Sequence, residues 1–157
     1  MTTSLDTGWD ARSEWAAVID PALAHTDLLF VNHDEAEQLS RGSGVDYFLE
    51  RGVGLVITKV GARGCLVNKV SIPGFTVDVV DTTGAGDCFA GGFLAAMHRA
   101  MPVAEAARFA NAVGALNVQE LGAITGVRSF EDTLEWMRAQ DYRAESESKS
   151  QIPSSRT

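Results

Sequence analysis

The segment Asp81–Asp87, with the sequence Asp-Thr-Thr-Gly-Ala-Gly-Asp, contains the residue types that phosphoryl transfer needs. It follows the apolar run Phe75–Val80 and precedes a helix-like pattern, so the sequence predicts a strand, a glycine-rich turn and a helix start. Backbone N–H groups at a helix start lack internal partners, and the helix dipole favours an anion there. Gly84 and Gly86 let a phosphate come close, and Asp87 could accept the proton of an attacking hydroxyl. The turn therefore combines a candidate anion hole with a candidate general base.

The spacing of this turn excludes two other phosphate-binding motifs. A dinucleotide fingerprint requires a third glycine where Phe89 stands, and a P-loop requires a Lys followed by Ser or Thr, which is missing after Gly86. A tight strand-to-helix connection with Asp87 as a local cap is the structural alternative.

The whole string Asp81–Asp87, with an aromatic and glycine-rich helix start behind it, resembles the C-terminal signature of the ribokinase-like (PfkB) carbohydrate kinases. The resemblance implies that Asp87 is the catalytic base. It also implies that the backbone amides of Gly84, Ala85 and Gly86 form the anion hole for the transferring phosphoryl group of ATP.

Two metal sites follow from the same resemblance. Asn32 and Glu35 match an Asn-x-x-Glu element that acts near Mg²⁺ and the phosphates, mostly through water, which suits an ion that keeps several waters. Asp81 and the carbonyl of Thr83 match the place where many members hold a monovalent cation such as K⁺. As an alternative, Asn followed three residues later by Glu at a strand–helix junction is also a capping box.

Further matches indicate the nucleotide site. Lys59, Gly61 and Gly64 resemble the strand and turn that line the nucleotide in this family, and Asn111 lies in a segment that resembles the helix bordering the adenine. Without the resemblance, Lys59 could be the solvated end of a strand, and the two glycines could be ordinary turn residues.

Composition favours an acidic enzyme domain. The 157 residues are 45% hydrophobic, enough for one domain with a core. With 21 acidic and 13 basic residues the net charge is −8, which argues against nucleic acid or an anionic membrane as partner. No membrane-spanning stretch or signal peptide is evident, so we expect a cytoplasmic protein. The two cysteines and three histidines are scattered, without the spacing of a metal site or disulfide framework.

Apolar strands alternate with helices along the chain. Strands are expected at residues 4–6, 27–31, 55–60 and 75–80, and helices around Trp15 and from Gly86, Pro102 and Ser129. This order predicts an α/β fold with helices on both faces of a sheet and ligands at the strands' C-terminal ends. The resemblance implies a ribokinase-like, three-layer α/β architecture with a mostly parallel central sheet.

The resemblance covers only the C-terminal half of the family's fold. Residues 1–140 are expected to form the ATP-binding and catalytic part, and residues 141–157 a disordered tail with too little apolar surface to become ordered. The family's sugar-binding half has no counterpart in this sequence. A half sheet would expose an edge, so we expect a homo-oligomer or association with another chain through that edge.

Three functions remain open at this point. The first is an ATP-dependent carbohydrate kinase that phosphorylates a hydroxyl of a small-molecule sugar or sugar acid. The second is a catalytically silent remnant that binds nucleotide or a partner chain. The third is a nucleoside or vitamin-precursor kinase of the same fold.

Overall fold

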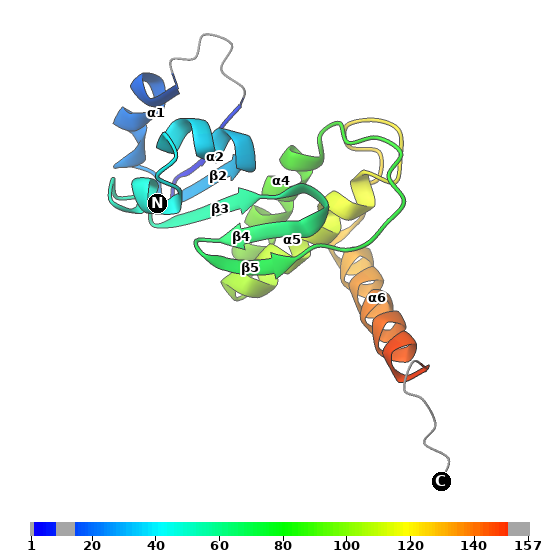
Figure 1. Ribbon diagram of the computed structural model, residues 1–157. Helices are drawn as coiled ribbons and strands as arrows, with labels where there is room; N and C mark the ends of the chain where they lie inside the picture. Colours follow the sequence, from blue (N-terminus) through cyan, green and yellow to red (C-terminus); the bar gives the residue numbers. More distant parts are fainter. Residues whose placement is uncertain (1, 9–14, 151–157) are drawn as a thin grey trace.

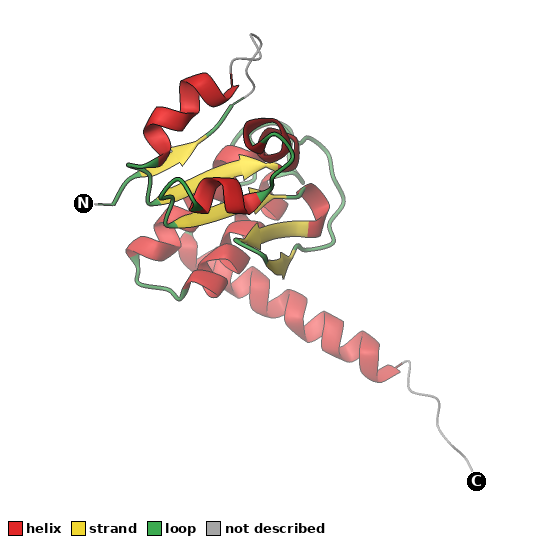
Figure 2. Ribbon diagram, turned by 60° about the vertical axis from the view of Figure 1, so that its left-hand side comes forward, coloured by secondary structure: helices red, strands yellow, loops and turns green. Residues whose placement is uncertain are grey.

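The computed structural model describes residues 2–8 and 15–150, which contain one five-stranded sheet with helices on both faces (Figures 1 and 2). The strands lie in the sheet in chain order: β1 (Ser4–Asp6), β2 (Leu28–Asn32), β3 (Leu55–Lys59), β4 (Gly64–Val67) and β5 (Val70–Pro73). β1, β2 and β3 are parallel, whereas β4 runs antiparallel to both β3 and β5. The carboxyl ends of the three parallel strands therefore meet at one edge of the sheet.

The antiparallel part is a difference from the mostly parallel sheet that was expected. Only Val60 and the 3₁₀ turn η1 (Gly61–Arg63) separate β3 from β4, and two residues separate β4 from β5. These connections are too short for the crossover that parallel strands need, so the chain reverses twice. Gly64 permits the first reversal, because its φ is +96° and a Cβ there would lie 2.3 Å from the carbonyl oxygen of Ile72.

The residues of β2 and β3 alternate between two hydrophobic cores. Leu29, Val31 and Val56 belong to one core, and Phe30 and Ile57 belong to the other. The first core packs under α1 (Trp15–Leu23), α2 (His33–Ser40) and α3 (Val45–Leu49); the second packs under α4 (Ala85–His98) and α5 (Val103–Asn117). The expected three-layer α/β architecture is confirmed.

Helices α4 and α5 form the closest helix pair of the fold. Phe93 of α4 is fully buried and packs edge-on against Phe30 of β2, with ring centroids 5.5 Å apart. A Cβ at Gly92 would lie 2.9 Å from Cγ2 of Val113, so the missing side chain lets the two helices approach closely. This contact fixes α4, whose first turn contains the glycine motif.

The strand expected at residues 75–80 does not form. Residues 74–80 are irregular, and the N–H groups of Val80 and Asp81 donate to the carbonyl of Val118 at 2.7 and 3.1 Å. The segment is thus tied to the end of a helix instead of to a neighbouring strand. Val79 and Val80 remain exposed, because no helix layer covers them.

Helix α6 (Phe130–Ser150) extends past Asp141, where a disordered tail was expected. Five of the ten residues 141–150 are Arg, Ala, Glu or Lys, which have high helix propensity, and the segment contains neither Gly nor Pro. The last turns of α6 project away from the rest of the molecule in both views (Figures 1 and 2). The remaining part of the expected tail, residues 151–157, lies outside the described residues.

Candidate active site

The glycine turn forms the start of α4. Gly84 is the N-cap residue, with φ +70° and ψ 0°, and Ala85 is the first helical residue. The Ala85 N–H donates to the carbonyl of Thr82 at 3.2 Å, so this amide already has a partner within the turn. The N–H groups of Gly86 and Asp87 stand in the first turn, where a helix provides no acceptor. They are the donors that an anion would meet, together with the positive end of the helix dipole.

Asp81 holds the turn from its N-terminal side. One carboxylate oxygen accepts from the Thr83 hydroxyl at 2.7 Å and from the Thr83 N–H at 2.9 Å, and the other accepts from the Gly122 N–H at 3.0 Å. These hydrogen bonds, the Thr83 hydroxyl first, lower the pKa of Asp81 because they stabilise its charged form. The carboxylate therefore ties the glycine turn to the loop after α5.

Asn117, at the end of α5, holds the turn from the opposite side. Its side chain is fully buried, and its amide nitrogen donates to the carbonyls of Thr83 and Ala123, each at 3.1 Å. The Asn117 Oδ1 atom has no partner among the described residues. Gly84 packs against the same loop so tightly that a Cβ would lie 2.2 Å from the Ala123 carbonyl oxygen. The conformation of the turn thus depends on contacts with residues 117–123.

Replacing Asn117 with alanine is expected to lower the free energy of unfolding by roughly 1–3 kcal/mol, because the fully buried amide is lost and two partly buried carbonyls lose their donor. Gln119→Ala is the matched control, since the half-buried Gln119 amide, just after α5, donates only to the Ala115 carbonyl of that helix. Urea denaturation followed by circular dichroism measures both variants. Equal losses in the two variants would show that Asn117 has no special bracing role.

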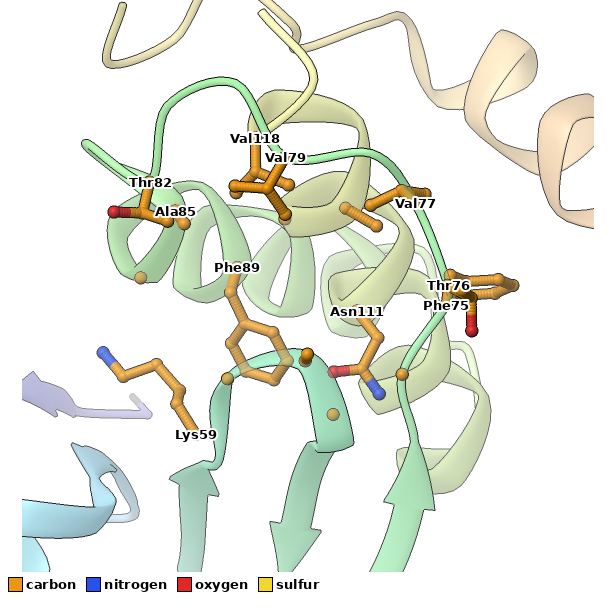
Figure 3. A pocket seen from close by; sticks show the side chains of 17 residues that line it. Lys59, Phe75, Thr76, Val77, Val79, Thr82, Ala85, Phe89, Asn111 and Val118 are labelled. Atoms are coloured by element: carbon orange, nitrogen blue, oxygen red, sulfur yellow. The ribbon is translucent and has the colours of Figure 1, made fainter.

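A cavity of about 410 Å³ lies between α4, α5 and the β3–β5 region. Lys59, Gly61, Gly64, Ala85, Gly86 and Asn111 line it, so the structure gathers six residues that the sequence assigned to the nucleotide site or the anion hole. The irregular segment, including Phe75, Val77 and Val79, forms its outer wall (Figure 3). Figure 3 shows Lys59 and Asn111 on either side of the Phe89 ring. The lining of the cavity is mostly apolar. Its charged group, the Lys59 ammonium, lies at the end next to the start of α4.

Asn111 contributes to the cavity by holding its wall. Its amide nitrogen donates to the carbonyls of Ile72 and Pro73 at 3.2 and 3.1 Å, which fixes the end of β5 against α5. The residue is buried in the protein interior. Its amide nitrogen therefore has a structural role whether or not a ligand is bound.

Lys59, at the end of β3, lies beside the candidate anion hole. A Cβ built on Gly86 would be 3.3 Å from its Nζ atom. The same Nζ pairs with Oδ1 of Asp6, at the end of β1, at 2.7 Å. Desolvation by burial raises the pKa of Asp6; the Lys59 ammonium opposes this shift, and the charges of Glu35 and Asp87 add to it. The carboxylates of Asp6, Glu35 and Asp87 thus lie in the same region as the Lys59 ammonium group.

Asn32 and Glu35 form the capping box of α2 that was considered as an alternative. The Asn32 Oδ1 accepts from the Glu35 N–H, and Glu35 Oε2 accepts from the Asn32 N–H, both at 2.8 Å. The Thr7 hydroxyl also donates to Glu35 Oε2, at 2.9 Å. Glu35 is buried at the carboxyl end of β2 but does not line the cavity. Asn32 and Glu35 therefore have the capping role. Any contact with a metal ion would use atoms of these two side chains that take no part in the capping hydrogen bonds.

Asp87 lies on the other side of the helix start from the cavity. It lines a second depression of about 440 Å³ together with Cys88, Gly91 and Arg128, whereas Gly86 lines the first. The candidate base and the candidate anion donors thus face two different spaces that meet at one helical turn.

Three residues near the site were missed by the sequence reasoning: Asp6, Thr7 and Asn117. Asp6 could have been found, because it ends a parallel strand just as Asn32 and Lys59 do, and ligand sites lie at such ends. Thr7 and Asn117 give no sequence signal, since their contacts join segments 28 and 34 residues apart.

Within residues 2–8 and 15–150, no three His, Cys, Asp or Glu side chains are arranged to hold a metal ion directly. Cys65 and Cys88 are both free and buried, and burial raises the pKa of the Cys65 thiol to about 11. None of the described helices is long and apolar enough to cross a membrane.

Comparison with known proteins identifies the relatives of this chain. Residues 2–129 match the family described as pfkB family carbohydrate kinase. The chain is 33% identical over 131 residues to the ribokinase of Haemophilus influenzae, covering 75% of this chain and 43% of that protein. The chain thus spans about half the length of the curated relatives it matches.

Solved structures agree with this assignment. The nucleoside kinase of Methanocaldococcus jannaschii superposes with a TM-score of 0.80 at 27% identity, covering 88% of this chain and 48% of that one. A candidate ribokinase II from E. coli, in complex with ATP and Mg²⁺, superposes with a TM-score of 0.78 at 28% identity, covering 88% and 49%. The fold, the helix-start site and the family match lead to one conclusion: the chain belongs to the pfkB family of carbohydrate kinases.

Proposed function

We propose that this chain is the nucleotide-binding and catalytic half of a kinase that transfers the γ-phosphate of ATP to a hydroxyl of a sugar or sugar acid. The main support is the convergence at the start of α4. The Lys59 ammonium and the first-turn N–H groups meet at the end of a mostly apolar cavity, one residue from the Asp87 carboxylate.

The proposed roles follow from the chemistry of these groups. Asp87 accepts the proton of the acceptor hydroxyl while its oxygen attacks the γ-phosphorus, and the bond to the ADP leaving oxygen breaks. The N–H groups around Gly86 and the Lys59 ammonium stabilise the negative charge on the transferring phosphoryl group. The apolar cavity between Phe89 and the 74–80 segment would hold the nucleoside part of ATP.

Mg²⁺ fits this site only through water and phosphate oxygens. Glu35 Oε2 and Asn32 Oδ1 already accept hydrogen bonds, and the described residues offer no direct cluster of protein ligands. Glu35 is nevertheless buried close enough to Asp6 for its charge to raise the Asp6 pKa. When bound, Mg²⁺ would neutralise phosphate charge, and Asn32 and Glu35 would orient its waters.

A monovalent cation such as K⁺ fits less well. Both oxygens of Asp81 accept hydrogen bonds, and the Thr83 carbonyl accepts one from the Asn117 amide. These donors compete with a cation for the same oxygens, although the Thr83 carbonyl and the Asp81 Oδ2 atom each accept only one hydrogen bond. The proposed mechanism therefore includes no step that depends on K⁺.

A second candidate is a nucleotide-binding or partner-binding chain without catalysis. One observation favours it: β1 is an edge strand of the described sheet. Association with another chain, or with a second copy, would cover that edge. The acceptor class is also open between sugars and nucleosides, because a ribokinase and a nucleoside kinase are both relatives.

Isothermal titration calorimetry of the chain with ATP and Mg²⁺ tests the nucleotide site. We expect binding that weakens by about tenfold in Val79→Glu, because Val79 lines the apolar part of the cavity and a carboxylate there would lose its water when the nucleoside part of ATP binds. Val80→Glu is the matched control: it adds the same charge at the next residue, which is exposed and outside the cavity. Absence of binding in a chain that circular dichroism shows to be folded would contradict the proposal, as would equal weakening in both variants.

A further inference from the structure

We propose that Asp6 is a positioning residue that holds the Lys59 ammonium at the anion hole. The inference rests on the proposed nucleotide site. It adds a residue from β1, an element to which neither the sequence motifs nor the proposed mechanism gives a role.

The first observation is the ion pair itself. Lys59 Nζ and Asp6 Oδ1 are 2.7 Å apart, and the two side chains are only 16% and 28% exposed. The pair is thus partly shielded from water, unlike the Lys69–Asp46 pair on the surface, whose side chains are 67% and 55% exposed. A shielded pair restricts a lysine more than an exposed pair does, because less water competes for either partner.

The second observation is the position of the pair in the sheet. β1 and β3 flank β2, so the contact from Asp6 to Lys59 passes over the carboxyl end of the middle strand. The α4 start lies above this end, where Lys59 Nζ would be 3.3 Å from a Cβ on Gly86. An ammonium has three donors. One is used by Asp6, and two remain for phosphate oxygens.

The third observation is the competition for the ammonium. Glu35 and Asp87 both lie close enough to Asp6 to raise its pKa. Lysine has a flexible four-carbon stem, so without Asp6 the ammonium is free to move toward either remaining carboxylate. A Lys59–Asp87 pair would remove the ammonium from the phosphates and reduce the basicity of the carboxylate. Asp6 prevents both outcomes by holding Lys59 on the β1 side.

The direction of the change in ATP affinity distinguishes a positioning role of Asp6 from a simple effect of its charge. Removing a carboxylate near a polyanion would by itself tighten ATP binding, because repulsion decreases. Loss of positioning would weaken binding, because Lys59 must then be ordered by the ligand. Asp6→Asn retains an oxygen acceptor for Lys59 without the charge, whereas Asp6→Ala retains neither.

The test is a double-mutant cycle on ATP·Mg²⁺ affinity, measured by calorimetry after binding by the unmodified chain has been established. We expect Asp6→Ala to weaken binding about three- to tenfold, Asp6→Asn to retain most of the affinity, and Asp6→Ala to have no further effect in a Lys59→Ala background. Asp46→Ala, which breaks the exposed pair, is the matched control and should change nothing.

Two results would overturn the inference while leaving the proposed function intact. One is binding by Asp6→Ala that is unchanged or tighter. The other is a loss of the same size with and without Lys59, which would indicate a structural role of Asp6 in the sheet. No binding by the unmodified, folded chain would instead contradict the proposed nucleotide site, and with it this inference.

Discussion

Asp87→Asn is expected to reduce phosphoryl transfer by about a hundredfold or more, because an amide cannot accept the proton of the attacking hydroxyl. The substitution keeps the size of the side chain at the first turn of α4, so the fold and the affinity for ATP·Mg²⁺ should be unchanged within about twofold. The measurement is ADP formation with a panel of sugars, sugar acids and nucleosides, with calorimetry for binding. A selective loss of turnover would assign the base.

Asp78→Asn is the matched control for this prediction. Asp78 is exposed in the irregular segment and does not line the cavity, so the same chemical change there should leave transfer and binding intact. Transfer that survives in Asp87→Asn would remove Asp87 from the role of base. Loss of ATP binding in the same variant would indicate that the carboxylate instead holds the helix start in shape.

Gly84→Ala is expected to abolish nucleotide binding and to lower the free energy of unfolding by roughly 2–4 kcal/mol. The new Cβ would lie 2.2 Å from the Ala123 carbonyl oxygen and 2.9 Å from its carbonyl carbon, so a backbone segment would have to move. The φ of +70° adds strain for any residue with a side chain. Moving the 117–123 loop would also displace the hydrogen bonds that hold Asp81 and Thr83.

Gly42→Ala distinguishes the backbone strain from the steric clash. Gly42 has φ +81°, but the nearest atom to a Cβ there would be the Glu37 Oε1 side-chain atom at 3.5 Å, so alanine costs mainly backbone strain. We expect Gly42→Ala to destabilise the chain less and to bind ATP·Mg²⁺ normally. Urea denaturation and calorimetry compare the two. Nucleotide binding that is retained in Gly84→Ala would show that the precise shape of the turn is not required.

Much of the fold could be predicted because the relevant signals are local. Ser129 caps α6 by accepting from the Asp132 N–H at 3.1 Å, and Asn32 and Glu35 form the capping box that their spacing predicts. Continuous apolar runs at β2 and β3 predicted strands buried on both faces, since a strand between two helix layers has no polar side. Each of those signals comes from residues that are close together in the sequence.

The structure differs in detail from the expectations where a local pattern had two outcomes. The Phe75–Val80 run has the composition of a strand, but whether it joins a sheet depends on a free neighbouring edge, and its backbone instead bonds to the end of α5. The mixed sheet follows from the short connections between β3, β4 and β5, which cannot hold the crossover that parallel strands need. Neither outcome is encoded in the spacing of apolar residues.

The candidate site also has features that local sequence predicts and features that depend on the tertiary structure. The sequence by itself determined which groups could do chemistry. Asp87, the glycines of the turn and Lys59 each belong to a motif whose residue types suit proton transfer or phosphate binding. Only the tertiary structure decided how they are held, through the Asp6–Lys59 pair, the Thr7 contact to Glu35 and the Asn117 brace. These contacts join residues 28 to 53 positions apart, and such pairs form only when the sheet and helices have brought the segments together.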